Sequence, residues 1–418
     1  METHLADFVR DTSAGKEAEA ILRKCVHCGF CTATCPTYQL LGDELDGPRG
    51  RIYLIKQVLE GETPTAKTQL HLDRCLTCRA CETTCPSGVH YSRLLDIGRE
   101  LVDAQVPRVG VDAATRTALK SFVPRAWLFG AAMKLGQMVR PILPRAIKAK
   151  VPPLSSAGAL PDATHARKMI ALAGCVQPSM YPNINGATTR VLDRLGISLI
   201  SAKPAGCCGA LRLHLGDAAA AQDDARRNID AWWPLVEAGA EAIVMTASGC
   251  GVQVKDYAHL LQDDANYREK AARIAALTRD ISEVLASESE RLQMMLKVLL
   301  PPVEEVSRVA FHNPCTLQHG QQIRGLAEQM LDDAGFTLTP VTDSHLCCGS
   351  AGAYSILQAE ISQQLRTNKL AGLLATQSNV TITIASANVG CISHLAGGTK
   401  VAVKHWIELI DERLNAHL

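Results

Sequence analysis

Apolar residues at helical spacing mark the first quarter of the chain. In RGRIYLIKQVLEG, residues 49–61, Ile52, Ile55 and Leu59 fall on one face and a glycine follows them, so we expect a helix there. A second helix is predicted over residues 91–102. The N-terminal domain is therefore expected to be mainly helical.

Beyond residue 166 the pattern changes to short apolar runs that alternate with helical stretches, and this happens twice. The strand-like runs are MIALAGC, ISLISA and AIVMTASGC in the first copy, and RVAFHNPC, FTLTPV and VTITIASANVGC in the second. A helix is predicted over AAAAQDDARRNIDAWWPLVEAG in the first copy. Alternating strands and helices predict a parallel sheet in each copy, so we expect two tandem, duplicated Rossmann-like α/β domains.

Eight cysteines keep nearly fixed positions in the two copies. The second set lies 140, 140, 140 and 141 residues after the first, and the two sets are Cys175, Cys207, Cys208 and Cys250, and Cys315, Cys347, Cys348 and Cys391. Such constant spacing indicates an internal duplication. The cysteines fall near predicted strand ends, where open α/β sheets place their sites, and a glycine after each cysteine pair permits a tight turn. We interpret these cysteines as a candidate additional cluster or redox site, with buried free thiols as the alternative.

The other eight cysteines form two copies of C-x2-C-x2-C-x3-C-P, the spacing of bacterial two-cluster ferredoxins. In that arrangement the fourth cysteine of each motif binds the cluster held by the other motif. We therefore predict two [4Fe–4S] clusters with the ligand sets Cys25, Cys28, Cys31 and Cys85, and Cys75, Cys78, Cys81 and Cys35. Structural zinc is the alternative, but zinc sites do not call for a third cysteine at this spacing or a proline after the fourth.

Composition and charge indicate the number of domains, the kind of partner and the cellular location, but not the reaction. The 418 residues suggest about two to four domains. A net charge of +1 gives no reason to expect nucleic acid as a partner. The N-terminal METHLADFVRD lacks the features of a secretory signal, and no apolar stretch reaches spanning length. We expect a cytoplasmic chain, with peripheral association with the cytoplasmic face of the inner membrane as an alternative, in which sixteen cysteines indicate metal or redox chemistry.

The segment 113–165 differs in charge from the parts of the chain before and after it. Between residues 113 and 161 it contains no acidic residue and eight basic ones, interleaved with apolar residues. Two interpretations stay open. The segment is either a basic amphipathic surface for anionic lipid or an acidic partner subunit, or a linker that packs across the two domains.

The sequence shows no motif for a site that converts a substrate. There is no glycine-rich nucleotide motif after a strand and no convincing nucleophile–base set, so no catalytic residue is assigned. His312, His345 and His394 lie beside the duplicated cysteines and are expected to be core or supporting residues rather than ligands. The chain is therefore predicted to move electrons that another subunit takes from a substrate.

Longer stretches resemble a known family. The run CVHCGFCTATCPTYQLLGDELDGPRGRIYLIKQVLEG, followed by LDRCLTCRACETTCPSGV, NIDAWWPLVEAGAEAI and DSHLCCGSAG, closely resembles the iron–sulfur subunits of glycolate oxidase. The resemblance implies a complex with flavoprotein subunits, in which FAD is on a partner that oxidises glycolate to glyoxylate, with D-lactate as a related substrate. This chain would pass the electrons to a downstream acceptor, with quinone expected. The alternative is the matching subunit of a lactate or glycerol-3-phosphate dehydrogenase.

The duplicated C-terminal repeats resemble the CCG domains of heterodisulfide reductase. That resemblance implies unusual clusters and adds a further alternative, an enzyme that acts on a disulfide at the CCG site. The family pattern ends in CxxC, whereas Gln253 and His394 stand where its last cysteine would be. Four thiolates per repeat remain, either for a conventional cluster or in a structural role.

These expectations combine into a multidomain α/β protein. We predict a mainly helical two-[4Fe–4S] ferredoxin domain over residues 1–112 and a basic amphipathic linker over residues 113–165. The two CCG domains are predicted over residues 166–300 and 301–418.

Overall fold

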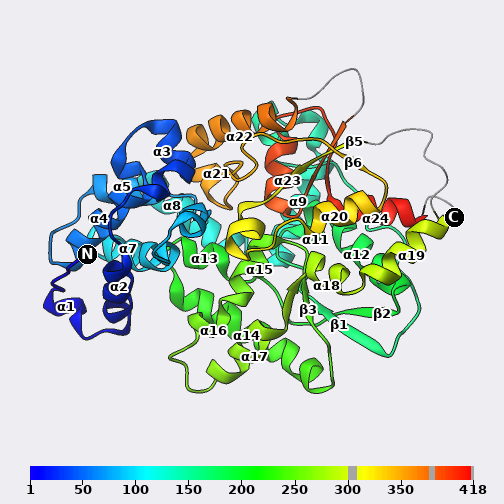
Figure 1. Ribbon diagram of the computed structural model, residues 1–418, viewed down its shortest axis with the longest axis horizontal. Coiled ribbons are helices and arrows are strands. Elements are labelled where there is room, and N and C mark those ends of the chain that lie inside the picture. The colour runs from blue at the N-terminus through cyan, green and yellow to red at the C-terminus, as the bar shows by residue number, and fades with distance from the viewer. Residues whose placement is uncertain (300–307, 376–381, 416–418) are drawn as a thin grey trace.

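The computed structural model describes residues 1–299, 308–375 and 382–415 (Figure 1). Residues 1–112, all of which are described, contain helices and no strand. The helices are α1 (Asp7–Arg10), α2 (Ser13–Lys24), η1 (Phe30–Thr34), α3 (Pro36–Leu41), η2 (Glu44–Asp46), α4 (Pro48–Leu59), α5 (Ala66–Asp73), α6 (Ala80–Thr84) and α7 (Tyr91–Gln105). The helices predicted over residues 49–61 and 91–102 are confirmed as α4 and α7. We call residues 1–112 the N-terminal domain.

Helix α4 shows why the local sequence folds as it does. Pro48 occupies its first turn, where the fixed φ of proline suits a helix and the missing N–H costs nothing. Ile52, Ile55 and Leu59 are buried, and they share one core with Leu94 and Leu95 of α7. This packing of apolar faces stabilises short helices that would be marginal alone.

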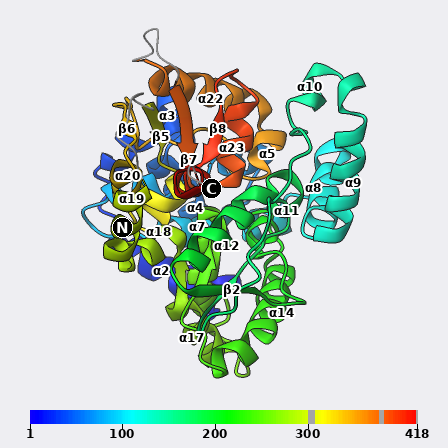
Figure 2. The same cartoon turned by 90° about the vertical axis from the view of Figure 1, so that its right-hand side faces the viewer.

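The segment after the N-terminal domain is helical. It forms α8 (Gly110–Phe122), α9 (Ala126–Met138), η3 (Arg140–Ile142) and α10 (Arg145–Lys148), which stand along one side of the molecule in Figure 2. Gln137 of α9 donates a hydrogen bond of 3.1 Å to the carbonyl of Ser179, so the segment is packed against the region that follows it. Among the residues that the structure describes, no helix is both long enough and apolar enough to cross a membrane.

Two modules with the same topology follow, and we call them the first module (residues 166–299) and the second module (residues 308–415). The first contains β1 (Arg167–Ala171), α11 (Gln177–Met180), α12 (Pro182–Arg194), β2 (Ile197–Ser201), α13 (Ala210–His214), α14 (Ala218–Glu237), β3 (Ile243–Met245), α15 (Ser248–Lys255), α16 (Tyr257–Leu260), α17 (Arg268–Leu277), β4 (Thr278–Asp280), α18 (Ile281–Ser287) and α19 (Ser289–Leu299). The second contains β5 (Arg308–His312), η4 (Thr316–Gly320), α20 (Leu326–Asp333), β6 (Thr337–Leu338), α21 (Tyr354–Leu357), α22 (Ala359–Leu373), β7 (Ile382–Ser386), α23 (Val389–Ala396), β8 (Val403–His405) and α24 (Trp406–Asn415).

Each module is built on a parallel four-stranded sheet. The strand orders are β2-β1-β3-β4 and β6-β5-β7-β8, and every pairing is parallel. The predicted order of a mainly helical domain followed by two duplicated α/β domains is confirmed. The short fourth strands, β4 and β8, were not predicted.

The predicted strand ends need correction. The apolar runs of the sequence extend to the cysteines, but β1 ends at Ala171 and β3 at Met245. Cys250 and Cys391 instead lie in the first turns of α15 and α23. The residues that continue each run belong to loops and to the starts of helices. The predicted boundary between residues 300 and 301 lies outside the described residues.

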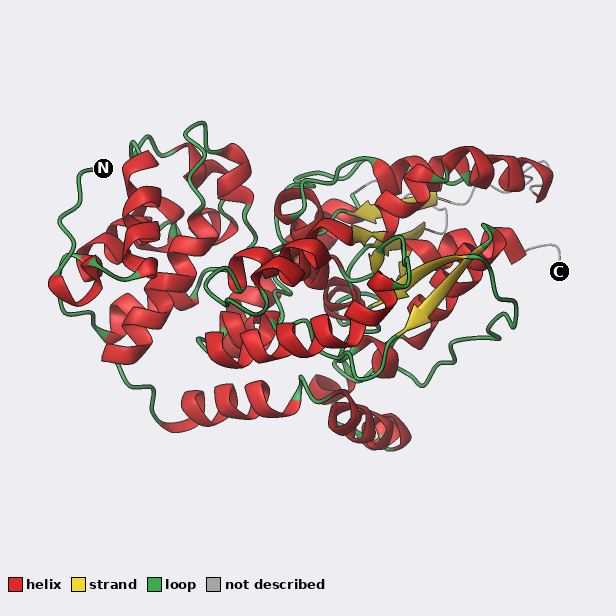
Figure 3. Cartoon of the chain, turned by 90° about the horizontal axis from the view of Figure 1, so that it is seen from below, coloured by secondary structure: helices red, strands yellow, loops and turns green. Residues whose placement is uncertain are grey.

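The two modules share one hydrophobic core. Met169, Ile184 and Val191 of the first module belong to the same buried cluster as Phe311 and Trp406 of the second. Ion pairs between α12 and α24 extend this contact, with Arg190 Nη2 at 2.7 Å from Asp411 Oδ2. The N-terminal helices occupy one end of the molecule and the sheets the other (Figure 3).

Candidate iron–sulfur sites

One cavity of the N-terminal domain is lined by cysteines from both motifs. Its walls include Cys25, Cys28, Cys31 and Cys85, together with apolar side chains such as Ile52. A second cavity is lined by Cys35, Cys75, Cys78 and Cys81. Cys81 also lines the first cavity, so both cavities draw cysteines from both motifs, as the ferredoxin spacing implies. Four thiols around an apolar cavity are the donor set that a [4Fe–4S] cluster requires, so the residues present fit such a group.

The two cysteine loops have the same unusual backbone. His27 and Gly29 lie between the first three cysteines of one motif with φ of 60° and 85°, and Thr77 and Arg79 occupy the same places in the other with φ of 53° and 59°. Left-handed conformations are costly for residues other than glycine and persist where the surroundings require them. The same left-handed positions in both motifs fit loops that turn three thiols toward one point.

A buried arginine lies beside the second cavity. Arg51 is 1% exposed, lines that cavity and donates to Thr37 Oγ1 and to the carbonyl of His71, at 3.2 and 2.7 Å. Burial disfavours its charge, but the nearby Cys75 and Asp46 hold its pKa above the ordinary value. A fixed positive charge at this place would stabilise the anionic thiolate ligands of a cluster.

Arg51 was not predicted as a functional residue, although its position in the sequence carried a signal. Arg51 falls on the buried face of α4, four residues before Ile55 and eight before Leu59. A charged residue at a core position of an amphipathic helix indicates a buried partner.

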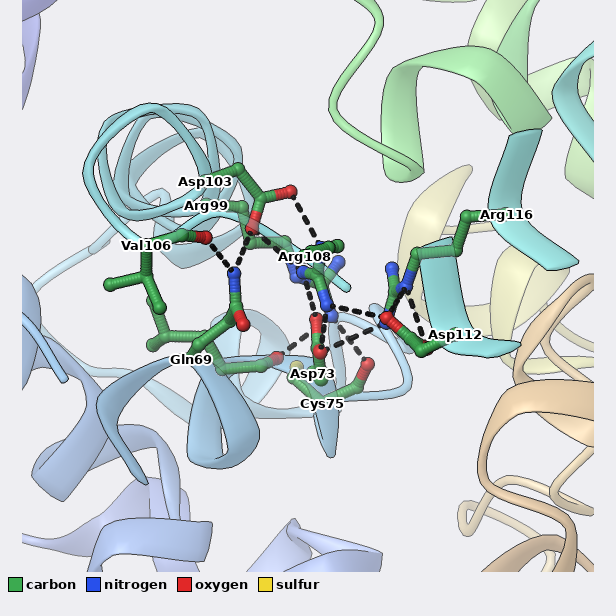
Figure 4. Close-up of polar contacts among 10 residues, drawn as sticks. Gln69, Asp73, Cys75, Arg99, Asp103, Val106, Arg108, Asp112 and Arg116 are labelled. Atoms are coloured by element: carbon green, nitrogen blue, oxygen red, sulfur yellow. Dashed lines mark hydrogen bonds and ion pairs between the residues drawn. The ribbon is translucent and has the colours of Figure 1, made fainter. Parts of the chain in front are cut away.

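A network of ion pairs and hydrogen bonds holds the backbone at the start of the second cysteine motif, around Cys75 (Figure 4). Arg99 donates to the carbonyl oxygens of Leu72 and Cys75, both at 2.9 Å. Nearby, Arg108 forms a two-point contact with Asp73 at 2.7 and 2.9 Å. Because Asp73 ends α5 just before the loop, these contacts position the backbone of Cys75.

The cysteines of each module lie next to one another. In the first module, side-chain contacts join Cys175 to Cys207 and Cys208 to Cys250. In the second module Cys315 Sγ lies 3.7 Å from Cys347 Sγ. All four cysteines of this set are buried, whereas Cys175 and Cys250 of the first set are only partly buried. The structure thus brings each predicted set of four together, although one module keeps its thiols further from solvent.

The glycine after each cysteine pair has the conformation that the sequence suggested. Gly209 has φ of 90° and Gly349 has φ of 87°. A Cβ on Gly349 would lie 2.6 Å from the carbonyl oxygen of Ser362, so a side chain would collide with α22. These glycines hold the cysteine pairs close to the helix that follows.

The second cavity of the N-terminal domain lies against the second module. Cys78, which lines that cavity, shares a buried apolar cluster with Cys315, Cys347 and Tyr354 of the second module. Burial and the adjacent Cys315 raise the pKa of Cys78. Tyr354 Oη donates to the carbonyl of Arg74 at 3.1 Å across this contact. The two groups of cysteines are therefore joined through a buried apolar contact.

Comparison with known proteins gives consistent matches along the chain. A family model described as a 4Fe-4S dicluster domain matches residues 21–89, and one described as a cysteine-rich domain matches residues 170–255 and 309–396. The glycolate oxidase iron–sulfur subunit of Escherichia coli (strain K12) is 51% identical over 99% of this chain and 99% of that protein. The probable glycolate oxidase iron–sulfur subunit of Bacillus subtilis is 31% identical over 94% of each chain. Lactate utilization protein A of Geobacillus thermodenitrificans is 24% identical over 57% of this chain and 96% of that protein.

Proposed function

Since the chain belongs to the family of glycolate oxidase iron–sulfur subunits, we propose that it carries electrons away from a flavoprotein partner that oxidises glycolate. The observation that supports this most directly is the pair of cavities, each lined by at least four cysteines and both lined by Cys81 and Tyr91. When bound, a [4Fe–4S] cluster accepts and releases one electron at a time. The chain's own part is to hold the thiolates, exclude water and supply the fixed charge of Arg51.

The proposed ligand sets follow the two cavities. Cys25, Cys28, Cys31 and Cys85 would hold one cluster, and Cys35, Cys75, Cys78 and Cys81 the other. The buried contact between Cys78 and Cys315 suggests that the duplicated cysteines continue the same route. We therefore propose a third iron–sulfur centre in at least the second module.

The overall reaction balances without a catalytic residue on this chain. Glycolate loses two electrons and two protons to become glyoxylate on a flavin-bearing partner. This chain conducts the two electrons singly to an acceptor, for which we propose a quinone, and the quinone takes up two protons as it is reduced. D-Lactate is a second candidate substrate of the partner, because lactate utilization proteins are among the relatives.

The first test is iron and acid-labile sulfide per chain on protein purified without oxygen. About eight irons would correspond to two cubane clusters in the N-terminal domain alone, whereas about twelve or more would require iron in the modules. Iron close to zero, with zinc in its place, would overturn the electron-transfer proposal.

The second test addresses the partner and the substrate. The chain should co-purify with flavoprotein subunits, and the complex should reduce a dye with glycolate as the electron donor. Cys78→Ser should abolish transfer beyond the flavin while leaving the flavin reducible by glycolate. A complex that responds to D-lactate but not to glycolate would favour the lactate alternative.

We further propose peripheral contact with a membrane through α9. Its exposed side carries Trp127, Leu135 and Met138, which are 75%, 62% and 76% exposed, together with the exposed cations Arg125 and Lys134. Apolar and cationic side chains on one helix favour an anionic lipid interface. Sedimentation with vesicles that contain anionic lipid should be lost in Trp127→Glu, and equal binding of the variant would count against the proposal.

A further inference from the structure

The second module contains a buried imidazole whose hydrogen bonding is incomplete. His312, the last residue of β5, is 2% exposed. Its Nδ1 lies 2.9 Å from Ser386 Oγ on the neighbouring β7, but Nε2 has no hydrogen-bond partner in the described residues. Buried polar atoms are usually paired, so this ring nitrogen is available to a ligand.

The imidazole lies beside two thiols of the duplicated set. A ring nitrogen of His312 and the Sγ atoms of Cys348 and Cys391 all lie within 4.8 Å of one another. Ligand atoms about 2.0–2.3 Å from one tetrahedral ion are separated by roughly 3.5 Å, so three atoms at this spacing can share an ion. Among the described residues, the cysteines of the N-terminal domain make no group this tight, as expected where four thiolates are spread over four irons.

Neighbouring residues suit a metal–thiolate centre. Asn388 Nδ2 lies 3.3 Å from Cys391 Sγ and can donate to it, which would orient the thiolate. Lys369 is 4% exposed, and its Nζ donates to the carbonyl of Asp343 at 2.6 Å. A buried cation near Cys347 and Cys348 would balance the charge of thiolate ligands.

The first module offers a built-in contrast. Leu172 stands 140 residues before His312, at the matching place after β1, and is also buried. Leucine has no donor atom, so the first module cannot supply an imidazole there. The two modules thus keep the same four cysteines but differ in the possible fifth ligand.

We propose that His312 ligates iron of the centre in the second module, beside Cys348 and Cys391. The inference rests on the proposed presence of iron in that module. It replaces our sequence-based expectation that His312 only supports the core. Nitrogen ligation raises the reduction potential of iron–sulfur centres, so the second module would draw electrons from the N-terminal clusters.

The test uses the whole chain, purified without oxygen from cells supplied with ¹⁵N-histidine. Pulsed electron paramagnetic resonance, on samples poised oxidised and reduced, should detect nitrogen coupling to an iron centre. The coupling should disappear in His312→Ala and in His312→Cys, while His312→Cys should retain more iron than His312→Ala. Leu172→Ala, the matched variant of the first module, should keep the coupling unchanged.

Several outcomes would overturn the inference, and they can be told apart from failure of the electron-transfer proposal. Absence of coupling in the wild type, or its persistence in His312→Ala, rules out His312 as an iron ligand. Zinc that is lost from His312→Ala would show a metal site of another kind. About eight irons per chain with intact signals of the N-terminal clusters would remove the third centre and leave the two-cluster function standing.

Discussion

The first and second modules have the same strand order and the same four cysteines, yet the surroundings of those cysteines differ. In the first module Cys175 and Cys250 are partly exposed, and the charges near the thiols include Arg212, which is paired at 2.8 Å with Asp224. In the second module all four cysteines are buried, and the nearby groups include His312 and Lys369.

This difference coincides with the position of the N-terminal domain. The wall of its second cavity touches the second module through the apolar cluster around Cys78 and Cys315. Its contact with the first module includes the ion pair between Arg79 and Asp256 at 2.7 Å. If electrons pass from Cys78 to Cys315 as proposed, only the second module lies on their route, and the two duplicated sites would then have different roles on one scaffold.

The largest expected effect comes from matched substitutions in the cysteine pairs. We expect Cys348→Ser to lower the rate of electron transfer through the assembled complex by about tenfold or more, the scale seen when support of a metal site is lost. Cys208→Ser, its counterpart in the first module, should have a much smaller effect. The check is glycolate-dependent dye reduction together with iron content. Equal losses of electron-transfer rate in both variants, or no loss in either, would contradict a functional difference between the modules.

A second effect should follow from removing the buried cation of the second module. Lys369→Met deletes a positive charge near the thiols, so the reduction potential of a centre there should fall by about 60 mV, equivalent to a tenfold change for a one-electron couple. In metal-free protein the same change should raise the melting temperature, because a poorly paired buried charge is removed. Arg212→Met should leave the potential of the second centre unchanged in redox titration.

Replacing the glycine after each cysteine pair should destabilise the protein by different amounts in the two modules. Both Gly209→Ala and Gly349→Ala place a side chain at a left-handed φ, which costs about 1–3 kcal/mol. Gly349→Ala should be the more damaging, because its Cβ would lie 2.6 Å from Ser362 O, against 3.0 Å from Ala221 O at Gly209. Denaturant unfolding of the two variants measures the difference, and the reverse order would contradict the packing described.

The smallest effects are expected at the contacts of the N-terminal domain. Tyr354→Phe removes one hydrogen bond to Arg74, worth about 1 kcal/mol, at the contact with the second module. Asp256→Asn weakens a partly exposed ion pair with the first module by about 1 kcal/mol or less. Only Tyr354→Phe should slow electron transfer. A slower rate in Asp256→Asn would place the first module on the route as well.

The sequence predicted what is encoded locally and repeated. Regular cysteine spacing indicated two four-cysteine groups, and the 140-residue offset indicated the duplication. It could not show that Cys78 and Cys315 meet, because residues so far apart in the chain are joined only by tertiary packing. The significance of His312 and Lys369 was missed for the same reason, since their roles depend on buried neighbours, whereas the place of Arg51 on the apolar face of α4 was a signal in the sequence.

The shared core of the two modules has a consequence for how the protein unfolds. Trp406 of the second module is packed in the same buried cluster as Ile184 of the first, so neither half can lose its structure without exposing apolar surface of the other. The first and second modules should therefore unfold together in a single cooperative transition, and either module expressed alone should aggregate. Although the repeat arose by duplication, the two copies are now one thermodynamic unit.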